Sequence, residues 1–197
     1  MTGINDWIKD LEAAFNAARQ SNDIPKILRL AERIIGQIDQ RRATDMVTDE
    51  ESVNCLKSIK RIAYNAAADA WPAWSDTAAA RTDEELAHAI KLAERSWACV
   101  QQLNQSPMQR GNAVWLIGAL CLAQNNRTAA YAHFAQAAND YGQASARAMQ
   151  LMAEGYCTIA LNPAGLAIIL EQLAVSTEPH SAELAGQLRI AQGIFNR

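Results

Sequence analysis

The side chains best suited to acid–base or metal chemistry are scattered along this sequence. The three histidines, His88, His133 and His180, lie far apart, each in its own stretch of helical pattern. No H-E-x-x-H spacing, glycine-rich phosphate loop or G-x-S-x-G turn accompanies them. His133 stands beside Tyr131 and Phe134 and is better explained as a packed or partly exposed side chain than as a base or ligand. We therefore expect no catalytic residue, no metal site and no cofactor.

The four cysteines do not form a metal-binding pattern either. Cys55, Cys99, Cys121 and Cys157 are widely spaced, and each lies among apolar neighbours. Cysteines that bind metals or form redox pairs usually come close together in sequence. We predict four buried free thiols, and with them a reducing, cytoplasmic compartment.

The charge balance argues against nucleic acid and membranes as partners. The net charge is −3 over 197 residues, and the one dense basic cluster, Lys57, Lys60 and Arg61, has the spacing of a solvated helix face. The N-terminal sequence MTGINDWIKDLE lacks the apolar centre of a secretory signal. Residues 113–123 are apolar apart from one glycine, but they give only about 16 Å of helix, roughly half of a bilayer core. This segment should be buried in protein.

The composition indicates an all-α protein. Half of the residues are hydrophobic and a fifth are charged, while proline and glycine are scarce and no segment alternates like a β-strand. Thr48 and Thr82 each open a Thr-Asp-Glu-Glu sequence, in which the threonine can cap a helix and the glutamate three residues later can bond back to it. Further predicted helix starts are Asp23, Ser106-Pro107, Asn126, Asn162-Pro163 and Thr177.

These signals divide the chain into nine predicted helices: 4–20, 24–41, 49–71, 83–104, 107–124, 127–141, 143–161, 163–175 and 179–195. Nearly all linkers are short, so neighbouring helices should pack as antiparallel hairpins. The exception is 72–82, PAWSDTAAART, which is either an insertion or a continuation of the preceding helix beyond a proline kink.

Residues 111–144 carry the clearest repeat. Val114-x2-Ile117-Gly118-x2-Cys121 is followed by Ala130-x3-Phe134-x2-Ala137. This spacing resembles the tetratricopeptide repeat (TPR), a two-helix unit of about 34 residues with the pattern W-x2-L-G-x2-Y and then A-x3-F. Valine and cysteine replace the family's tryptophan and tyrosine. Gly118 and Ala130 are small where two helices should cross closely, and Ile117 and Phe134 are large where the next hairpin should be met.

Weaker copies of the pattern cover most of the remaining chain. In 146–179, Met149-x2-Met152-Ala153-x2-Tyr156 precedes Gly165-x3-Ile169-x2-Gln172, and only Gln172 departs from the expected small residue. In the hairpin 4–41, Glu12 and Ile24 are unsuited to a close crossing, so this hairpin should splay. In 49–104, eleven extra residues separate the two halves. The sequence LRLAER at 28–33 recurs as IKLAER at 90–95, which supports pairing of the second helices.

The resemblance implies a right-handed, TPR-like solenoid of antiparallel helical hairpins. We therefore expect one domain, 1–197, with irregular hairpins at 4–41 and 49–104 and clear repeats at 111–144 and 146–179. The apolar helix at 180–196 should cap the open end, because the last repeat otherwise exposes a core face. An irregular helical bundle is the alternative.

In such a solenoid, the first helices line a concave groove that holds the binding site. The repeat phase places these residues on the groove: Lys9, Asn16, Asn112, Trp115, Arg147, Gln150 and Glu154. Trp115 has an alternative role as a core residue. The groove floor around Ala119, Leu122 and Ala123 is apolar, which suits an apolar helix or peptide, or another part of this chain. Ala13, Leu116 and Leu151 stand where some TPR proteins have polar clamps for a C-terminal carboxylate.

The sequence Trp71-Pro72-Ala73-Trp74 opens the long linker. Tryptophans concentrate binding energy at interfaces, and loops carry function more often than the scaffold does, so this segment is a candidate interface loop. The alternative is that Trp71 closes its own helix onto the core while Trp74 covers a splayed junction.

The sequence therefore favours a non-catalytic scaffold or adaptor that binds another protein or peptide through its groove. A small-ligand or peptide sensor that uses the same groove is the second hypothesis, and an enzyme of a helical family without a local motif is the third. The N-terminal hairpin and the tryptophan segment are surfaces through which the chain could form a homodimer.

Overall fold

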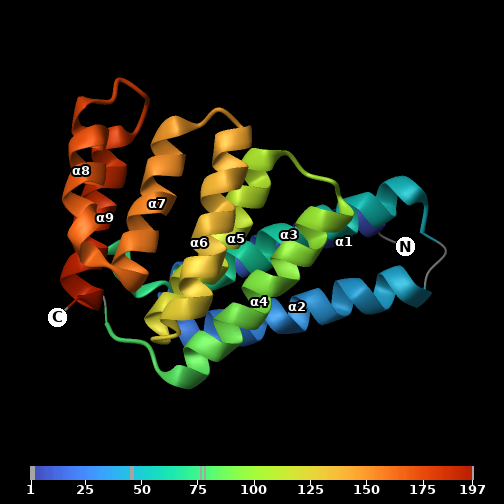
Figure 1. Ribbon diagram of the computed structural model, residues 1–197. Helices are drawn as coiled ribbons and strands as arrows, with labels where there is room; N and C mark the ends of the chain where they lie inside the picture. Colours follow the sequence, from blue (N-terminus) through green and yellow to red (C-terminus); the bar gives the residue numbers. More distant parts are fainter. Residues whose placement is uncertain (1–2, 45–46, 76, 78, 197) are drawn as a thin grey trace. The chain divides into compact units, whose positions relative to one another are not determined.

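The computed structural model describes residues 3–44, 47–75, 77 and 79–196. Within this part of the chain the secondary structure is entirely helical (Figure 1), which confirms the predicted all-α class. The α-helices are α1 (Ile4–Arg19), α2 (Ile24–Thr44), α3 (Asp49–Asp69), α4 (Asp83–Gln102), α5 (Pro107–Ala123), α6 (Arg127–Gln143), α7 (Arg147–Leu161), α8 (Leu166–Val175) and α9 (Ser181–Phe195). Two short 3-10 helices, η1 (Pro72–Trp74) and η2 (Pro163–Gly165), lie between them.

The chain divides into two compact units. Unit 1 comprises Met1–Ala70 and Ala87–Gln105, and so holds α1, α2, α3 and most of α4. Unit 2 comprises Trp71–Leu86 and Ser106–Arg197, and so holds η1 and α5 to α9. Each unit is described by itself below.

Most helices begin where a capping residue was predicted. Thr48 Oγ1 accepts from the Glu51 backbone N–H at 3.2 Å while the Glu51 carboxylate accepts from the Thr48 N–H at 2.9 Å, and Thr82 with Glu85 repeats both bonds at 3.2 and 2.7 Å. Side-chain caps are also present at Asp23, Ser106, Asn126 and Asn162. These bonds satisfy backbone donors that the first turn of a helix leaves unpaired.

Several predicted boundaries differ from those of the structure. Thr177 does not start a helix: α9 begins at Ser181, after His180, whose φ of 65° lies in the left-handed region. The segment from Pro163 begins as the 3-10 turn η2, and α8 proper starts at Leu166. Helix α6 continues to Gln143, and α7 begins only at Arg147.

The turns that follow α4, α5 and α6 share one closing geometry. A residue with positive φ ends each helix: Asn104, Asn125 and Ser145. After α5, the Asn126 N–H donates to the Cys121 carbonyl and the Asn125 N–H to the Leu122 carbonyl, both at 2.9 Å. The same pair of backbone bonds follows α4 and α6. This is the Schellman motif, which fills the last free carbonyls of a helix, and asparagine is one of the few side chains that tolerate the left-handed conformation.

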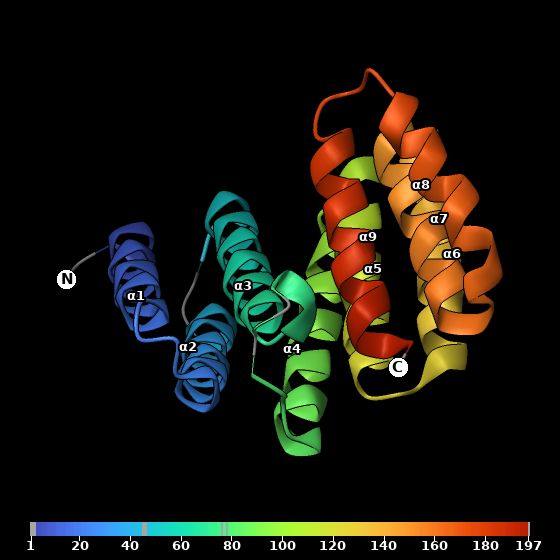
Figure 2. The same ribbon diagram turned by 90° about the vertical axis from the view of Figure 1, so that its left-hand side faces the viewer.

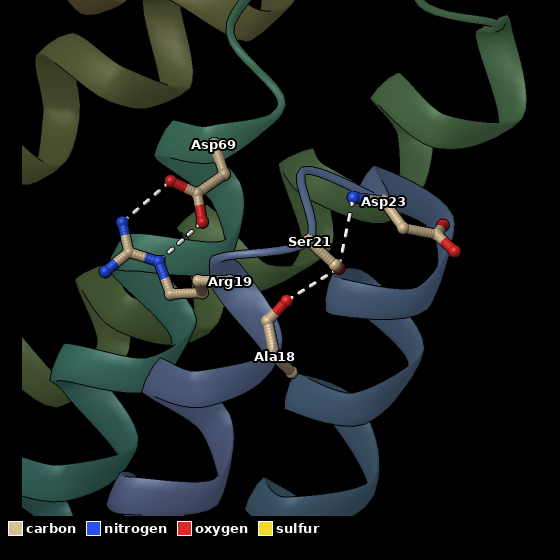
Figure 3. Close-up of polar contacts among 5 residues, drawn as sticks. All are labelled: Ala18, Arg19, Ser21, Asp23 and Asp69. Carbon is tan, nitrogen blue, oxygen red and sulfur yellow. Dashed lines mark hydrogen bonds and ion pairs between the residues drawn. The ribbon is translucent and has the colours of Figure 1, made fainter.

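In unit 1, α1 runs alongside α3 in the same direction. Figure 2 shows α1 beside both α2 and α3. Asn54 bonds to Asn5 near the start of both helices, Ser58 to Glu12 in the middle, and Arg19 to Asp69 at the end. Figure 3 shows the last of these contacts, in which the Arg19 guanidinium donates two bonds to the Asp69 carboxylate at 2.6 and 2.7 Å. The pairing with Asp69 raises the pKa of Arg19.

Glu12 has a role that its sequence position did not reveal. It seemed unsuited to a close crossing with α2, but its carboxylate contacts α3 instead, where it accepts from Ser58 and pairs with Arg61. Arg61, one of the three residues of the predicted basic cluster, is therefore partly neutralised.

The repeated hexapeptides lie on helices that are joined by ion pairs. Arg95, the last residue of IKLAER, donates to both carboxylate oxygens of Asp39 on α2 at 2.7 and 2.8 Å. About two turns earlier on both helices, His88 approaches Glu32 at 3.3 Å. The two contacts advance together along the chain, so α2 and α4 run in the same direction.

In unit 2, α5 and α6 form a close antiparallel hairpin. Gly118 lies against the Phe134 ring, so that an added Cβ would come within 2.9 Å of it. At the other end of the hairpin, Gly111 packs in the same way on Tyr141, whose hydroxyl donates to Asn112 at 2.9 Å. The close crossing predicted at Gly118 is confirmed.

Helix α6 lies between α5 and α7, and α8 and α9 lie on the other side of α7 (Figure 1). Gly142 faces Gln150 and the Cys157 thiol donates to the Tyr131 carbonyl at 3.9 Å, so α6 and α7 are antiparallel. Ala148 contacts Glu178 near the start of α9 and Gly155 contacts Leu188 further along it, so α7 and α9 run in the same direction.

At both ends of α7, side chains from other helices or loops form hydrogen bonds with its free backbone groups. The Glu178 carboxylate accepts from the Ala148 N–H at 2.7 Å. At the C-terminal end, Arg127 of α6 donates to the carbonyls of Ile159 and Ala160 at 3.0 and 3.3 Å. The other nitrogen of Arg127 donates to the Phe195 carbonyl in α9 at 2.5 Å. A carboxylate at the N-terminus and a guanidinium at the C-terminus both complement the helix dipole.

No helix in the described part of the chain is long and apolar enough to cross a membrane. The apolar segment of α5 is instead buried along its length.

Candidate functional site

The three tryptophans singled out in the sequence come together in unit 2. Trp71 and Trp74 flank and end the short helix η1, and Trp115 lies on α5. The ring centroids of Trp71 and Trp115 are 6.3 Å apart, and those of Trp74 and Trp115 are 6.2 Å apart. Residues more than thirty positions apart in sequence thus form one contact group, which we call the tryptophan cluster.

Two further aromatic residues, which were not predicted as part of a site, belong to this cluster. Tyr156 of α7 meets the Trp115 ring edge to face at 5.3 Å, and Phe195 at the end of α9 stacks on Trp71 at 5.3 Å with 22° between the planes. Tyr156 also contacts Phe134 at 5.0 Å. Tyr156 had been recognised only as a repeat position, and nothing in the local sequence pairs Phe195 with Trp71.

Exposure separates the members of the tryptophan cluster. Trp71 is 1% exposed and Trp115 is 5% exposed, so both are core residues of unit 2. Trp74 is 46% exposed and lies over this core. Trp71 and Trp115 therefore have the structural role of core residues, whereas Trp74 is partly exposed to solvent.

Two polar groups inside the cluster have no partner. Trp115 Nε1 and Tyr156 Oη are buried, and neither makes a hydrogen bond in the described part of the chain. Burial raises the pKa of Tyr156, so its hydroxyl stays protonated and is able to donate. Nearly all buried polar groups in folded proteins are hydrogen-bonded, and an unpaired one typically costs about 1–3 kcal/mol. The tryptophan cluster therefore holds two of the buried unpaired polar atoms of the described chain.

The polar residues predicted on α7 form a row on its surface. Arg147 and Gln150 both donate to one oxygen of Glu154, at 3.5 and 2.8 Å. Arg147 is exposed, and both bonds are made within one helix face. The polar side chains of this row therefore bond to one another.

Cys157 continues that row and is the one cysteine that is not fully buried. Burial and the neighbouring Glu154 carboxylate raise the pKa of Cys157 to about 12. A thiol with this pKa is almost entirely protonated at neutral pH and is a poor nucleophile. Cys55, Cys99 and Cys121 are buried as predicted, whereas Cys157 is half-buried, because it lies at the solvent side of the α6–α7 contact.

The remaining predicted groove residues are Lys9 and Asn16 on α1 and Asn112 on α5. Lys9 pairs with Asp6 on the surface of α1 at 3.1 Å, and Asn16 is exposed on the same helix. Asn112 accepts from Tyr141 at the start of α5. The expected open groove floor is not formed by α5, because Ala119 and Leu122 are buried.

Unit 1 holds a surface pocket of about 400 Å³ that no sequence argument anticipated. It is lined by Trp7, Gln37, Gln40, Arg41 and Thr44. The Arg41 guanidinium lies 4.7 Å from the centre of the Trp7 ring, a cation–π contact. Within the described residues no group of three histidine, cysteine, aspartate or glutamate side chains is arranged to hold a metal ion.

A second unusual surface lies on the α7–α8 hairpin. Helix α8 buries Leu166 and Leu173 but exposes Ile168 at 61% and Val175 at 82%. Leu161, the last residue of α7, is also exposed. Helix α8 carries one charged side chain, Glu171. We call Ile168 and Val175 the α8 apolar face.

Comparison with protein-family models, with characterised proteins and with solved structures finds no match to this chain.

Proposed function

We propose that this protein is a non-catalytic scaffold of stacked, TPR-like hairpins that binds a helix of a partner protein along the α8 apolar face. The observation that carries the proposal is that α8 is apolar on both sides: Leu166 and Leu173 pack inward while Ile168 and Val175 face solvent. An exposed group of large apolar side chains on a stable helix is a common mark of an interaction surface.

The directions of the helices support the stacked-hairpin arrangement. In a stack of antiparallel hairpins, all first helices run one way and all second helices run the other way. Contacts within unit 1 make α1 parallel to α3 and α2 parallel to α4, and contacts within unit 2 make α7 parallel to α9. The Schellman turns after α4, α5 and α6 also support this arrangement, because three successive helices end with the same backbone geometry.

The partner is a helix rather than a strand or loop, since α8 offers side chains and no free backbone edge. Ile168 and Val175 are seven residues apart and therefore lie on one side of α8, two turns from each other. A helix that packs along this side needs apolar residues at intervals of three and four. Glu171 is the one charge on α8, so a lysine or arginine beside the partner's apolar stripe complements it.

Site-specific photo-crosslinking in the native host tests this proposal. Gln172 is exposed on α8 and is replaced by p-benzoylphenylalanine. The expected product is a crosslink to one partner, at a segment with apolar residues at intervals of three and four. The double variant Ile168→Glu/Val175→Glu should abolish the crosslink, while Ala132→Glu, an exposed change on α6, should leave it intact.

Three outcomes would overturn the proposal. The crosslinked segment could lack a helical apolar pattern, the Ile168→Glu/Val175→Glu variant could crosslink as well as the wild type, or the product could be a second copy of this chain. The last result would make the α8 apolar face a dimer surface instead. Circular dichroism of each variant verifies that unit 2 has remained folded.

A further inference from the structure

The tryptophan cluster contains two buried donors that find no acceptor among the described residues. Trp115 Nε1 and Tyr156 Oη belong to rings whose centroids are 5.3 Å apart, and they come from different helices, α5 and α7. Both residues are more than nine-tenths buried. Phenylalanine would fill nearly the same volume at position 156 without leaving a buried hydroxyl unpaired, so packing alone does not account for the tyrosine.

Trp74 lies against the Trp115 ring of this pair and is partly exposed to solvent. Its ring contacts Trp115 at 6.2 Å with a tilt of 47°, and nearly half of the side chain is in solvent. Trp71, three residues earlier, is fixed by contacts with Trp115, Tyr156 and Phe195.

We propose that the tryptophan cluster is a binding site for a neutral, flat aromatic molecule that carries a hydrogen-bond acceptor, and that this molecule takes the place of the Trp74 ring. The indole of Trp74 is itself a flat bicycle lying on Trp115, so it marks the shape and size that the position accepts. A free ligand differs from it by offering an acceptor to the unpaired donors.

The chemistry of the lining specifies a neutral ligand. Trp71, Trp115 and Tyr156 make no hydrogen bond or ion contact with a charged side chain among the described residues. A charged ligand would lose its hydration without gaining a counter-ion, which is costly. Because Trp115 and Tyr156 are both donors, a carbonyl, ether or aromatic ring nitrogen is the group that they can recognise.

Quinoline and naphthalene form a matched pair of probes for this site. They have the same shape, but quinoline carries a ring nitrogen that accepts a hydrogen bond. The five tryptophans give five indole N–H signals in a proton–nitrogen NMR spectrum, and the signal that disappears in Trp115→Phe belongs to Trp115. Quinoline should move this signal downfield in a saturable manner. Naphthalene should bind about fivefold more weakly, as expected from the loss of one hydrogen bond.

Variants separate the roles of the three residues. Tyr156→Phe keeps the ring and removes one donor, so the preference for quinoline over naphthalene should shrink. Trp74→Ala removes the competing ring, and both probes should bind several-fold more tightly. The double variant Ile168→Glu/Val175→Glu alters the α8 apolar face and should bind quinoline as the wild type does, which keeps this test independent of the proposed function.

Equal affinities for quinoline and naphthalene in both the wild type and Trp74→Ala would overturn the proposal, because occlusion by Trp74 could not then explain the result. It would also be overturned if Tyr156→Phe and Trp115→Phe lowered the melting temperature and left quinoline binding unchanged. That outcome would mean that an internal water molecule satisfies the two donors.

Discussion

Glu178 accepts a hydrogen bond from the backbone N–H of Ala148 at 2.7 Å, although thirty residues separate them. Ala146, which precedes α7, has no side-chain oxygen to cap the helix, and Glu178 supplies one from the loop between α8 and α9. Its negative charge also lies at the positive end of the α7 dipole. The start of α7 is therefore capped by a residue that follows both α7 and α8 in the sequence.

Replacement of Glu178 by alanine should lower the free energy of unfolding by about 1 kcal/mol, the usual worth of a helix N-cap. Urea denaturation followed by circular dichroism measures the change. The control is Glu171→Ala, which removes an exposed carboxylate from α8 that makes no cap. Equal stability of Glu178→Ala and Glu171→Ala would show that the Glu178–Ala148 bond contributes nothing.

Gly118→Ala should destabilise the protein by about 1–3 kcal/mol, because the added Cβ would lie 2.9 Å from the Phe134 ring and 3.1 Å from the His133 Cβ. Gly36 is a matched control, since it also lies within a helix but has no atom within 4 Å of the added Cβ. Gly36→Ala should stabilise the protein by about 0.5–1 kcal/mol through its better helix propensity. The same sign of change in both variants would contradict the close crossing of α5 and α6.

Trp71 and Trp74 should differ sharply in their contribution to stability. Trp71→Ala removes a buried ring that contacts Trp115, Tyr156 and Phe195, and should cost about 3–5 kcal/mol. Trp74→Ala removes a ring that is almost half in solvent, and should cost about 1 kcal/mol. Thermal denaturation of the two variants side by side checks this, and a larger loss for Trp74→Ala would place the core of the cluster elsewhere.

The stability of the protein should decline as the pH rises above 9. Folding raises the pKa of Cys157 from its ordinary 9.0 to about 12, so the folded state holds this proton more tightly than the unfolded chain does. The resulting stabilisation is complete below pH 9 and is lost as the pH rises toward 12. Cys157→Ala should flatten the decline measured by urea denaturation between pH 8 and 10. Thr158→Val, a half-buried neighbour without a titratable group, should leave it as in the wild type.

The sequence predicted the helices well because their signals are local. Capping residues such as Thr48 and Thr82 act on backbone groups within one turn, and Gly118 marks a crossing within one hairpin. The predicted start at Thr177 was wrong because the chain takes the left-handed conformation at His180 and α9 begins only after it, at Ser181. Asn104 and Asn125 adopt the same conformation, which asparagine tolerates.

The candidate site was less predictable because its contacts are distant in sequence. Trp71, Trp74 and Trp115 were each singled out, but no pattern indicated that they meet, or that Tyr156 and Phe195 join them. The polar residues predicted for a groove followed from the repeat phase alone, and Arg147 and Gln150 bond to Glu154 on their own helix. The exposed side of α8 gave no signal either, because an apolar ten-residue helix reads as core.

The stacking of Trp71 on Phe195 has a consequence for the order in which unit 2 is completed. The two rings come from the first and nearly the last residues of that unit, so their contact has a very high sequence separation. During synthesis on a ribosome, Trp71 emerges early and lacks this partner until α9 has been made. The face of the Trp71 indole that stacks on Phe195 therefore stays uncovered through the synthesis of α5 to α8, and this interval is the one in which a chaperone would have most to protect.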